Sequence, residues 1–145
     1  MQQKTIWLTV LIIGTLINLL SCTKTVDKSQ YEEFYYINNS NHDISITVFN
    51  KIDDSTLVIT YNISVNEDLS QEIELMSGSR TGIISMCDSV TVKFGNERIS
   101  HFIPNADSPY NILNYSNYIF LKKAENRNSY TYTFTEDDYE NSNEQ

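Results

Sequence analysis

Apolar and polar residues alternate with a period of two along most of this chain. The clearest stretches are 44–48, 57–65, 73–75, 90–94 and 130–134, where every second residue is aliphatic or aromatic. Successive side chains of a β-strand point to opposite faces, so this pattern places one face of each strand in a core and the other in solvent. After residue 22, no segment of ten or more residues keeps the i, i+3, i+4 apolar spacing of an amphipathic helix. The alternation therefore predicts an all-β fold.

Residues that favour turns separate these stretches. Groups rich in Asn, Asp, Ser or Gly occur at 38–41, 50–55, 66–68, 77–79, 95–96 and 125–128. Seven or eight short antiparallel strands with such regular turns predict one β-sandwich over residues 31–136. The runs 34–37 and 118–121 are the richest in apolar and aromatic residues, which is typical of central strands.

The Gly-Asn pair at 95–96 predicts a tight hairpin between two of these strands. A two-residue loop places Val92 opposite Ile99, and a four-residue loop places Phe94 opposite Ile99. Either register directs His101 to the inner face of the sandwich. A lone inward histidine is more often satisfied by a backbone carbonyl than used as a ligand or a base.

The chain begins with an apolar segment that ends abruptly at Cys22. Lys4 precedes the apolar-rich residues 6–20, and this segment forms a helix of roughly 22 Å at about 1.5 Å per residue. A helix that spans a bilayer core needs about 20 residues, so the length and the small Ser21 before Cys22 fit a signal peptide better. An uncleaved anchor helix is the alternative, which the polar Asn18 disfavours.

The Leu-Leu-Ser-Cys sequence at 19–22 resembles the lipobox of bacterial lipoprotein signal peptides. The resemblance implies that the thiol of Cys22 is alkylated with diacylglycerol and that the peptide bond before it is cleaved. We therefore expect residues 1–21 to be a signal-peptide helix and residues 22–30 to be a flexible tether. The acidic residues 137–145 are expected to form a disordered tail.

Cys22 and Cys87 are the only cysteines of the chain, and two cysteines of an exported domain can form a disulfide. Acylation of Cys22 excludes that pair and leaves Cys87 as the single thiol of the folded domain. Cys87 follows the mostly apolar residues 83–86, and no histidine or basic residue lies near it in sequence to lower its pKa. We expect a buried side chain rather than a nucleophile.

The chain is acidic, with 19 Asp and Glu residues against 10 Lys and Arg residues and a formal net charge of -9. Removal of residues 1–21, which contain one Lys and no acidic residue, changes this charge from -9 to -10. An acidic surface repels phosphate backbones and anionic lipid headgroups. We therefore expect no nucleic-acid partner, and we expect the membrane attachment to be the lipid on Cys22.

Catalytic and metal-binding motifs are absent from the sequence. The two histidines, His42 and His101, stand far apart, and the chain has no HExxH, CxxC, Gly-rich or nucleophile-elbow motif. The acidic clusters at 53–54, 67–68 and 136–138 lack the DxDxDG spacing that supplies several Ca²⁺ ligands from one loop. We therefore predict no catalytic residue, no metal site, no cofactor and no enzyme activity. An enzyme would require an accessible His101 beside a serine and a carboxylate.

The longest irregular connection lies within 104–118 and is rich in Tyr and Asn. Flat rings with amide groups suit the recognition of glycans or extended peptides. The candidate binding residues are Tyr110, Asn111, Asn114, Tyr115 and Tyr118. The alternative is that Ile112, Leu113 and one or two of the tyrosines close the end of the sandwich, because large apolar side chains are usually buried.

Two short sequences, Asp-Ser-Thr at 54–56 and Asp-Ser-Val at 88–90, resemble the Asp-Ser/Thr-apolar acceptor for O-glycosylation of exported proteins in certain Gram-negative anaerobes. The resemblance implies modification of Ser55 or Ser89. Ser55 fits the acceptor better, because its predicted turn is exposed whereas Ser89 begins a predicted strand.

The chain as a whole resembles small cell-envelope lipoproteins of Gram-negative gut anaerobes, in which an acylated cysteine and a short tether precede one immunoglobulin-like or related β-sandwich. The Tyr-x-Tyr-x-Phe-Thr sequence at 130–135 and the acidic residues after it carry this resemblance. It implies a non-enzymatic lipoprotein that presents the sandwich for binding or for assembly with other envelope proteins. The second hypothesis is a glycan- or peptide-binding module that uses 104–118. Thr23 differs from the Asp associated with inner-membrane retention, so the outer membrane is expected, with its periplasmic and surface faces both open.

Overall fold

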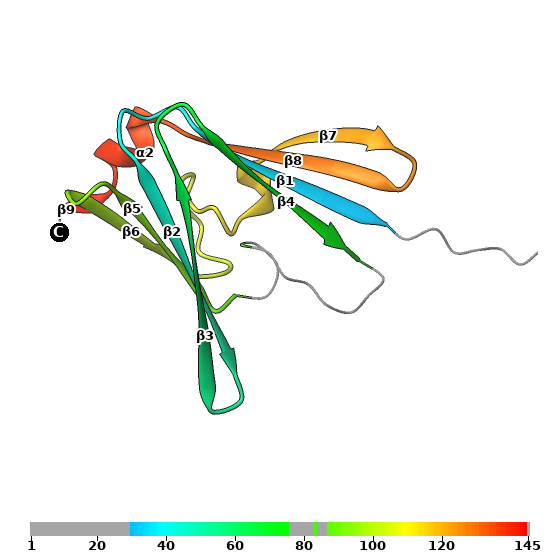
Figure 1. Ribbon diagram of the computed structural model, residues 1–145, viewed down its shortest axis with the longest axis horizontal. Coiled ribbons are helices and arrows are strands. Elements are labelled where there is room, and N and C mark those ends of the chain that lie inside the picture. Colours follow the sequence, from blue (N-terminus) through cyan, green and yellow to red (C-terminus); the bar gives the residue numbers. More distant parts are fainter. Residues whose placement is uncertain (1–29, 76–82, 84–86, 145) are drawn as a thin grey trace, which may run out of the picture.

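The computed structural model of the chain describes residues 30–75, 83 and 87–144. The predicted signal peptide, Cys22, residues 23–29 of the predicted tether and the predicted turn at 77–79 lie outside the described residues. The described part is mostly β-structure (Figure 1). Its helical elements are one α-helix of five residues and one 3-10 helix of three residues.

The described residues form nine strands in two sheets. In chain order the elements are β1 (Tyr31–Asn38), β2 (Ile44–Ile52), β3 (Ser55–Ile63), β4 (Asp68–Glu74), β5 (Ser89–Phe94), β6 (Arg98–Phe102), η1 (Tyr115–Asn117), β7 (Ile119–Ala124), β8 (Arg127–Phe134), α2 (Glu136–Glu140) and the two-residue β9 (Asn143–Glu144). Sheet A has the strand order β4-β1-β8-β7, and sheet B has the order β3-β2-β5-β6-β9. The prediction of a strand-rich, sandwich-like fold of two sheets is confirmed.

One pairing departs from the predicted all-antiparallel arrangement. β1 and β8 run parallel, with Tyr31 opposite Arg127 and Asn38 opposite Phe134, whereas the other described pairs are antiparallel. Turn residues indicate which consecutive strands form hairpins, but β1 and β8 lie at opposite ends of the domain in sequence. Sheet A is therefore a mixed sheet, which local patterns do not predict.

The hairpin between β5 and β6 has a loop of three residues, so both predicted registers are wrong by one residue. Lys93 is opposite Ile99. The Glu97 N–H closes the turn by donating to the Phe94 carbonyl oxygen at 3.3 Å. A shift of one residue turns every side chain of the strand to the other face. His101 consequently lies exposed on the outer face of sheet B and not on the predicted inner face.

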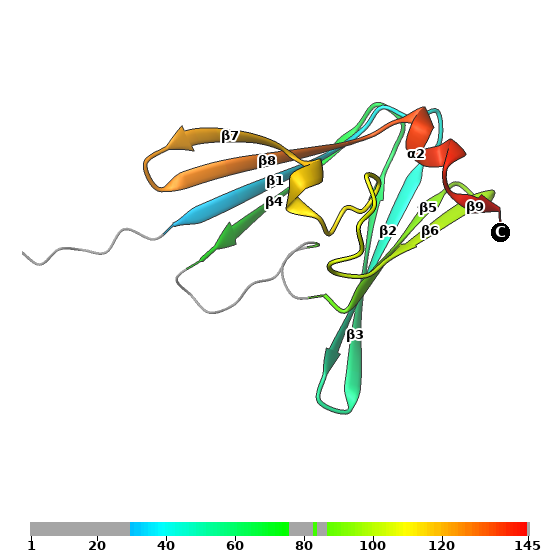
Figure 2. The same cartoon turned by 180° about the vertical axis from the view of Figure 1, so that it is seen from behind.

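The two sheets meet near α2 and diverge toward their other ends. The β2–β3 hairpin and the β7–β8 hairpin point away from each other in both views (Figure 1, Figure 2). The inward-facing residues of β3 are therefore buried at one end of the strand only. Ile63 is 2% exposed, whereas Leu57 is 47% exposed. The alternation over 57–65 predicts a strand correctly, but half of the apolar face lies outside the core.

The apolar run 118–121 does not form a central strand, contrary to the prediction. β7 is the last strand of sheet A, and Ile119, Phe120 and Leu121 are 73%, 54% and 61% exposed. The run 34–37 does lie in a central strand, because β1 has β4 on one side and β8 on the other. Apolar content alone does not report how many neighbours a strand has.

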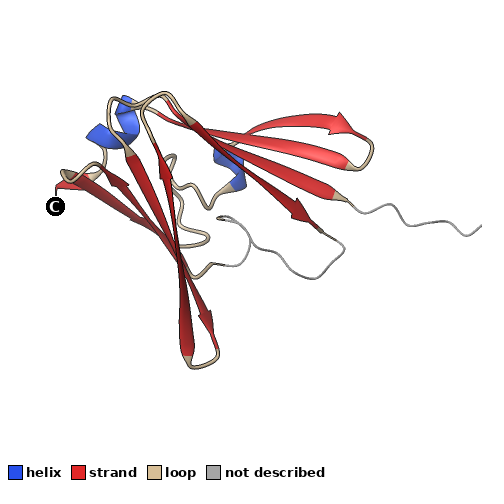
Figure 3. Cartoon of the chain, in the orientation of Figure 1, coloured by secondary structure: helices blue, strands red, loops and turns tan. Residues whose placement is uncertain are grey.

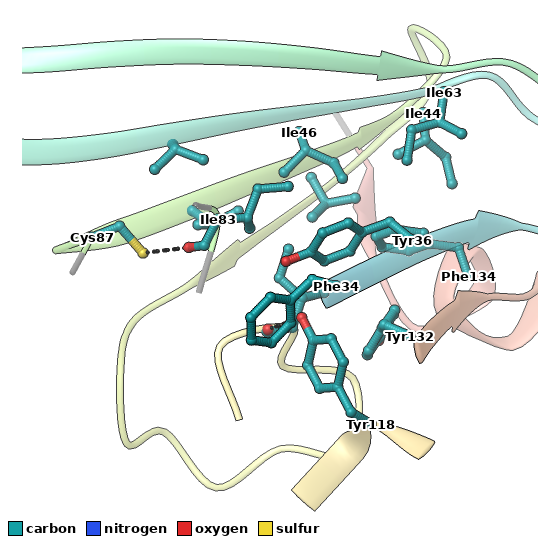
Figure 4. Packing of buried hydrophobic residues seen from close by; sticks show 14 of the residues in the cluster. Phe34, Tyr36, Ile44, Ile46, Ile63, Ile83, Cys87, Tyr118, Tyr132 and Phe134 are labelled. Atoms are coloured by element: carbon teal, nitrogen blue, oxygen red, sulfur yellow. Dashed lines mark hydrogen bonds between the residues drawn. The ribbon is translucent and has the colours of Figure 1, made fainter. Parts of the chain in front are cut away.

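The core lies between the two sheets (Figure 3, Figure 4). Its buried apolar residues are Phe34, Tyr36, Ile44, Ile46, Val48, Ile63, Ile73, Ile83, Cys87, Val90, Val92, Phe94, Ile112, Tyr118, Tyr132 and Phe134. The predicted burial of Cys87 is confirmed. Its thiol donates to the Ile83 carbonyl oxygen at 3.0 Å, and burial raises the pKa of Cys87 to about 11. The thiol is therefore protonated at neutral pH and packs as a small apolar group.

The C-terminal segment folds up to residue 144, in contrast to the predicted disordered tail over 137–145. Asp138 in α2 accepts hydrogen bonds from the backbone N–H and the hydroxyl of Thr135 at 2.8 and 2.7 Å, and from the Tyr132 hydroxyl at 2.8 Å. β9 then pairs with β6. Solvated acidic residues favour disorder. At the beginning of a helix, however, acidic residues accept hydrogen bonds from free N–H groups, and their negative charge interacts favourably with the positive end of the helix dipole.

Asn38, at the end of β1, joins the two sheets through its buried side chain. Its Nδ2 donates to the carbonyl oxygens of His42, Ile63 and Ser64 at 2.9, 3.1 and 3.1 Å. Its Oδ1 accepts from the N–H and the hydroxyl of Ser40 at 3.0 and 2.8 Å. The residue is 0% exposed. An amide suits this position because one end donates hydrogen bonds and the other accepts them.

Replacing Asn38 by Asp tests this role. The new carboxylate would face the same three carbonyl oxygens without a donor, and burial would raise its pKa. We expect Asn38→Asp to lower the free energy of unfolding at pH 7 by about 2–4 kcal/mol. Part of this loss should be recovered at pH 4, where the raised pKa keeps the folded-state carboxyl protonated and restores a donor. Urea denaturation at both pH values measures the effect, and the exposed Asn39→Asp is the control. Equal small losses for the two variants would contradict the assigned role.

Candidate functional site

Asn111, one of the candidate binding residues in 104–118, is buried and holds that connection together. It is 0% exposed. Its Nδ2 donates to the carbonyl oxygens of Ile103 and Ala106, both at 3.0 Å, and its Oδ1 accepts from the Leu113 N–H at 2.9 Å. A buried amide whose two ends are bonded to the backbone is not available to a ligand.

Tyr118 is part of the core and not of a binding surface. It is 7% exposed, and its hydroxyl donates to the Ile112 carbonyl oxygen at 2.6 Å. Its ring contacts those of Phe34 and Tyr36 edge to face, with centroids 5.9 and 6.1 Å apart (Figure 4). Burial raises the pKa of the Tyr118 hydroxyl. Tyr118 and Ile112 therefore have the packing role that the sequence leaves open as the alternative to binding.

Of the other three candidate residues, Asn114 and Tyr115 line one surface pocket of about 390 Å³, and Tyr110 does not line it. Tyr110 is half-buried. The Asn114 Oδ1 accepts from the N–H and the hydroxyl of Ser116 at 3.1 and 2.8 Å and so caps η1. Tyr115 is 44% exposed, and its hydroxyl donates to Glu32 at 3.4 Å. Of the three candidate tyrosines, Tyr115 is the most exposed.

The outer face of sheet A carries a trough of about 440 Å³ that sequence analysis does not predict. Tyr35 of β1 forms one wall, and Leu121 and Lys123 of β7 form the other. The floor is formed by Ser129 and Thr131 of β8, which lies between these two strands. We call this feature the sheet A trough.

The strand register explains why a trough forms here. Thr131 of β8 lies opposite Tyr35 of β1, and Ser129 of β8 lies opposite Leu121 of β7. Residues in register point to the same face of a sheet. Because the β8 residues are small and those on both sides are large, the centre of the sheet face is lower than its sides.

An ion-pair network crosses one end of the sheet A trough, from Lys123 on the β7 wall to Glu33 and Tyr35 of β1. Lys123 and Arg127 both contact the Glu33 carboxylate, and Arg127 also contacts Glu72. The Lys123 Nζ donates to the Tyr35 hydroxyl at 2.8 Å and lies 4.6 Å from the centroid of that ring. Hydrogen bonds from Lys123 and Arg127 lower the pKa of Glu33 to about 2. Glu33 is therefore ionised at neutral pH and holds Lys123 against the Tyr35 wall.

The end of the trough at the turn between β3 and β4 is acidic and polar. Asn66, Glu67 and Asp68 lie there. Their oxygens accept hydrogen bonds, and the hydroxyls of Ser129 and Thr131 both donate and accept them. None of the described residues that line the trough is a histidine or a cysteine. The arrangement suits binding of a polar ligand and lacks an activated nucleophile.

The two histidines have different surroundings. His101 is exposed, which the enzyme alternative requires, and its Nδ1 lies 3.1 Å from the Oγ1 of Thr91. His42 stacks on Tyr139 with ring centroids 3.8 Å apart, and its Nε2 lies 3.4 Å from Glu136. Within residues 30–75, 83 and 87–144, no group of three His, Cys, Asp or Glu side chains is arranged to hold a metal ion. No helix of this part is long and apolar enough to cross a bilayer.

The two predicted O-glycosylation sites differ in exposure. Ser55 is exposed beside the turn of the β2–β3 hairpin, and its hydroxyl donates to the Ile52 carbonyl oxygen at 3.0 Å. Ser89 is half-buried at the first position of β5, opposite Phe49. Modification of either serine stays a prediction. Cys22, the predicted lipidation site, lies outside the described residues.

The lowered pKa of Glu33 predicts an acid-sensitive part of the stability. The ordinary pKa of the residue is 4.5 and the folded-state pKa is about 2, so this stabilisation is present above pH 4.5 and is lost as the pH falls toward 2. We expect the urea midpoint of the wild type to fall more steeply over this range than that of Glu33→Gln. The exposed Glu125→Gln should behave like the wild type. Parallel curves for the wild type and Glu33→Gln would contradict the assigned ion pairs.

The sheet A trough has no signature in the sequence, because its residues come from four separate segments and are ordinary surface types. Alternation in β1 and β8 indicates which residues share a face, but it does not indicate that β1 lies beside β8. No family model matches the chain, and neither the curated proteins nor the solved structures contain a match. The function of this chain has to be inferred from its own residues.

Proposed function

We propose that this chain is a non-enzymatic lipoprotein of the cell envelope that is anchored through an acylated Cys22 and binds glycan chains in the sheet A trough. The observation that carries the proposal is the trough of about 440 Å³, which combines an aromatic ring, aliphatic side chains and hydrogen-bonding groups. The lipobox-like residues at 19–22 support the anchor. The immunoglobulin-like topology expected from the sequence stays a prediction.

The chemistry of the trough favours an uncharged glycan. Leu121 and Ile37 offer apolar surface for the C–H face of a sugar ring. Asn66, Glu67 and Asp68 offer oxygens that accept hydrogen bonds from sugar hydroxyls. An anionic ligand would meet two carboxylates here, on a chain with a formal net charge of -9. The same argument disfavours nucleic acid as a partner.

An anchored protein can use a shallow site. A groove that is open to solvent buries less of a ligand than an enclosed pocket, so one trough binds weakly. Copies held on one membrane bind a repetitive polysaccharide at several points, and the overall affinity then rises without any new contact. The outer membrane is the proposed location, and protease treatment of intact cells distinguishes its periplasmic face from its surface.

A second candidate is peptide binding at the surface around Tyr115. Tyr115, Phe120 and Tyr130 form an aromatic cluster in which the Tyr130 ring centroid lies 5.2 Å from that of Tyr115 and 5.4 Å from that of Phe120. Tyr115 and Phe120 are 44% and 54% exposed. Exposed aromatic rings are typical of binding surfaces for extended peptides.

The anchor is tested by replacing each cysteine separately. Cys22→Ala removes the thiol that would be acylated, so we expect no incorporation of labelled palmitate and an uncleaved precursor. Cys87→Ala removes only a buried thiol and should leave both lipidation and processing unchanged. Labelled palmitate followed by gel electrophoresis measures the first effect, and the apparent mass measures the second. Palmitate retained in Cys22→Ala would exclude this anchor.

The ligand site is tested by two alanine substitutions on one face of one strand. Leu121→Ala removes a wall of the sheet A trough and should weaken glycan binding on an array by roughly 10-fold. Ile119→Ala removes a side chain that does not line the trough and should change binding much less. Both residues are more than half exposed, so the melting temperature should stay near that of the wild type. A loss of glycan binding in Tyr115→Ala with none in Leu121→Ala would place the glycan at the surface around Tyr115 and contradict the sheet A trough as the site.

A further inference from the structure

The sheet edges differ in how well they are protected against pairing with another chain. An edge strand presents unpaired N–H and C=O groups, and proteins usually protect it with charged residues, proline, a β-bulge or a short strand. In the described sheets the edge strands are β4 and β7 in sheet A and β3 and β9 in sheet B.

Three of these four edges carry such protection. β4 contains three acidic residues, Asp68, Glu72 and Glu74. β7 contains Lys122 and Lys123, and its register with β8 shifts between Lys122 and Ala124. β9 has only two residues. A further strand cannot add to these edges without burying charge or breaking the ladder.

β3 carries none of these devices. Its nine residues, Ser-Thr-Leu-Val-Ile-Thr-Tyr-Asn-Ile, include no charged residue and no proline. Leu57, Val58 and Ile59 are 47%, 51% and 37% exposed. Its full length pairs with β2, from Ser55 to Ile63, and no described strand lies on its other side. The end of the β2–β3 hairpin projects away from the rest of the fold (Figure 2).

The charge of the protein indicates which chain can meet this edge. Two copies with a formal net charge of -9 repel each other over most of their surfaces. β3 is a long neutral segment, so two copies can approach here without placing like charges opposite each other. A strongly basic partner, in contrast, would gain nothing from an uncharged strand and would be drawn to the acidic surface elsewhere.

We propose that β3 pairs antiparallel with β3 of a second copy and joins the two five-stranded B sheets into one continuous sheet. A two-fold axis at Ile59, the central residue of β3, uses the whole strand. It places Ile59 opposite itself, Val58 opposite Thr60, and Leu57 opposite Tyr61. Aliphatic, aromatic and β-branched residues are favourable cross-strand neighbours. One strand pair buries less than the roughly 1,200 Å² of a standard interface, so the dimer is a weak one.

Cysteine cross-linking in cells that express the full chain tests the register. Neighbouring pairs of an antiparallel ladder alternate between a closer and a wider type, so two adjacent pairs are used. Only one of the two pairs has the spacing that a disulfide needs. Either Ile59→Cys should form a disulfide dimer through the 59–59 pair, or Val58→Cys co-expressed with Thr60→Cys should form one through the 58–60 pair. Val58→Cys alone should form none, and Ile119→Cys on β7 is the control edge. The absence of both dimers, equal cross-linking at 119, or a disulfide to another protein would overturn the proposal.

A charge exchange tests the same contact at equilibrium, on the purified full chain in detergent. Val58→Lys with Thr60→Lys places two like pairs across the axis and should weaken the dimer on the order of 10-fold. Val58→Lys with Thr60→Glu changes the same positions but places opposite charges together and should restore it. Sedimentation velocity measures the dimer, and the glycan array checks that the sheet A trough is unaffected. An equal effect of the two double variants, or a monomeric wild type up to about 1 mM, would overturn the proposal.

Discussion

The amide of Asn38 satisfies the backbone at the point where the chain leaves sheet A for sheet B. The carbonyl oxygens of His42, Ile63 and Ser64 meet at its Nδ2, and they belong to the segments that enter β2 and leave β3. A buried carbonyl without a donor costs more than a satisfied hydrogen bond contributes. The hydrogen bonds of Asn38 therefore stabilise the corner at which the two sheets meet, and the sheets share one core that includes Phe34 and Ile44.

The connection 103–118 uses the same chemistry. Asn111 bonds to backbone groups on both of its sides. The Asn117 Nδ2 donates to the carbonyl oxygens of Ser108 and Asn111 at 2.9 and 3.0 Å. The Asn residues that suggest sugar binding in the sequence thus bond to the backbone of this irregular segment, which lacks the regular hydrogen-bond ladder of a sheet. The exposed groups of this connection lie around Asn114 and Tyr115.

The sequence locates strands well, because burial of one face imposes alternation on each strand by itself. Ile44, Ile46 and Val48 are buried as their spacing predicts, and so are Val90, Val92 and Phe94. Features that depend on a second segment are not predicted. The loop at 95–97 has one residue more than a two-residue turn, and this reverses the faces of β6. The exposed run 119–121 has the composition of a central strand but lies at an edge of sheet A. The parallel neighbour of β1 is β8, in which Arg127 lies opposite Tyr31. The sheet A trough depends on the two strands beside β8, which are β1 and β7, and alternation within one strand does not identify them.

The position of β1 determines how the domain responds to mechanical load. The chain enters the fold at Tyr31, directly in a central strand that is paired on both sides, with β4 from Tyr31 to Ile37 and with β8 from Tyr31 to Asn38. A pull on the preceding segment along the strand axis acts on both ladders in shear, so their hydrogen bonds share the force and do not open one after another. A terminal hairpin at an edge would instead peel open from its end. A domain tethered by its N-terminus, as proposed for this chain, would meet tension at one of the most strongly paired strands of its fold.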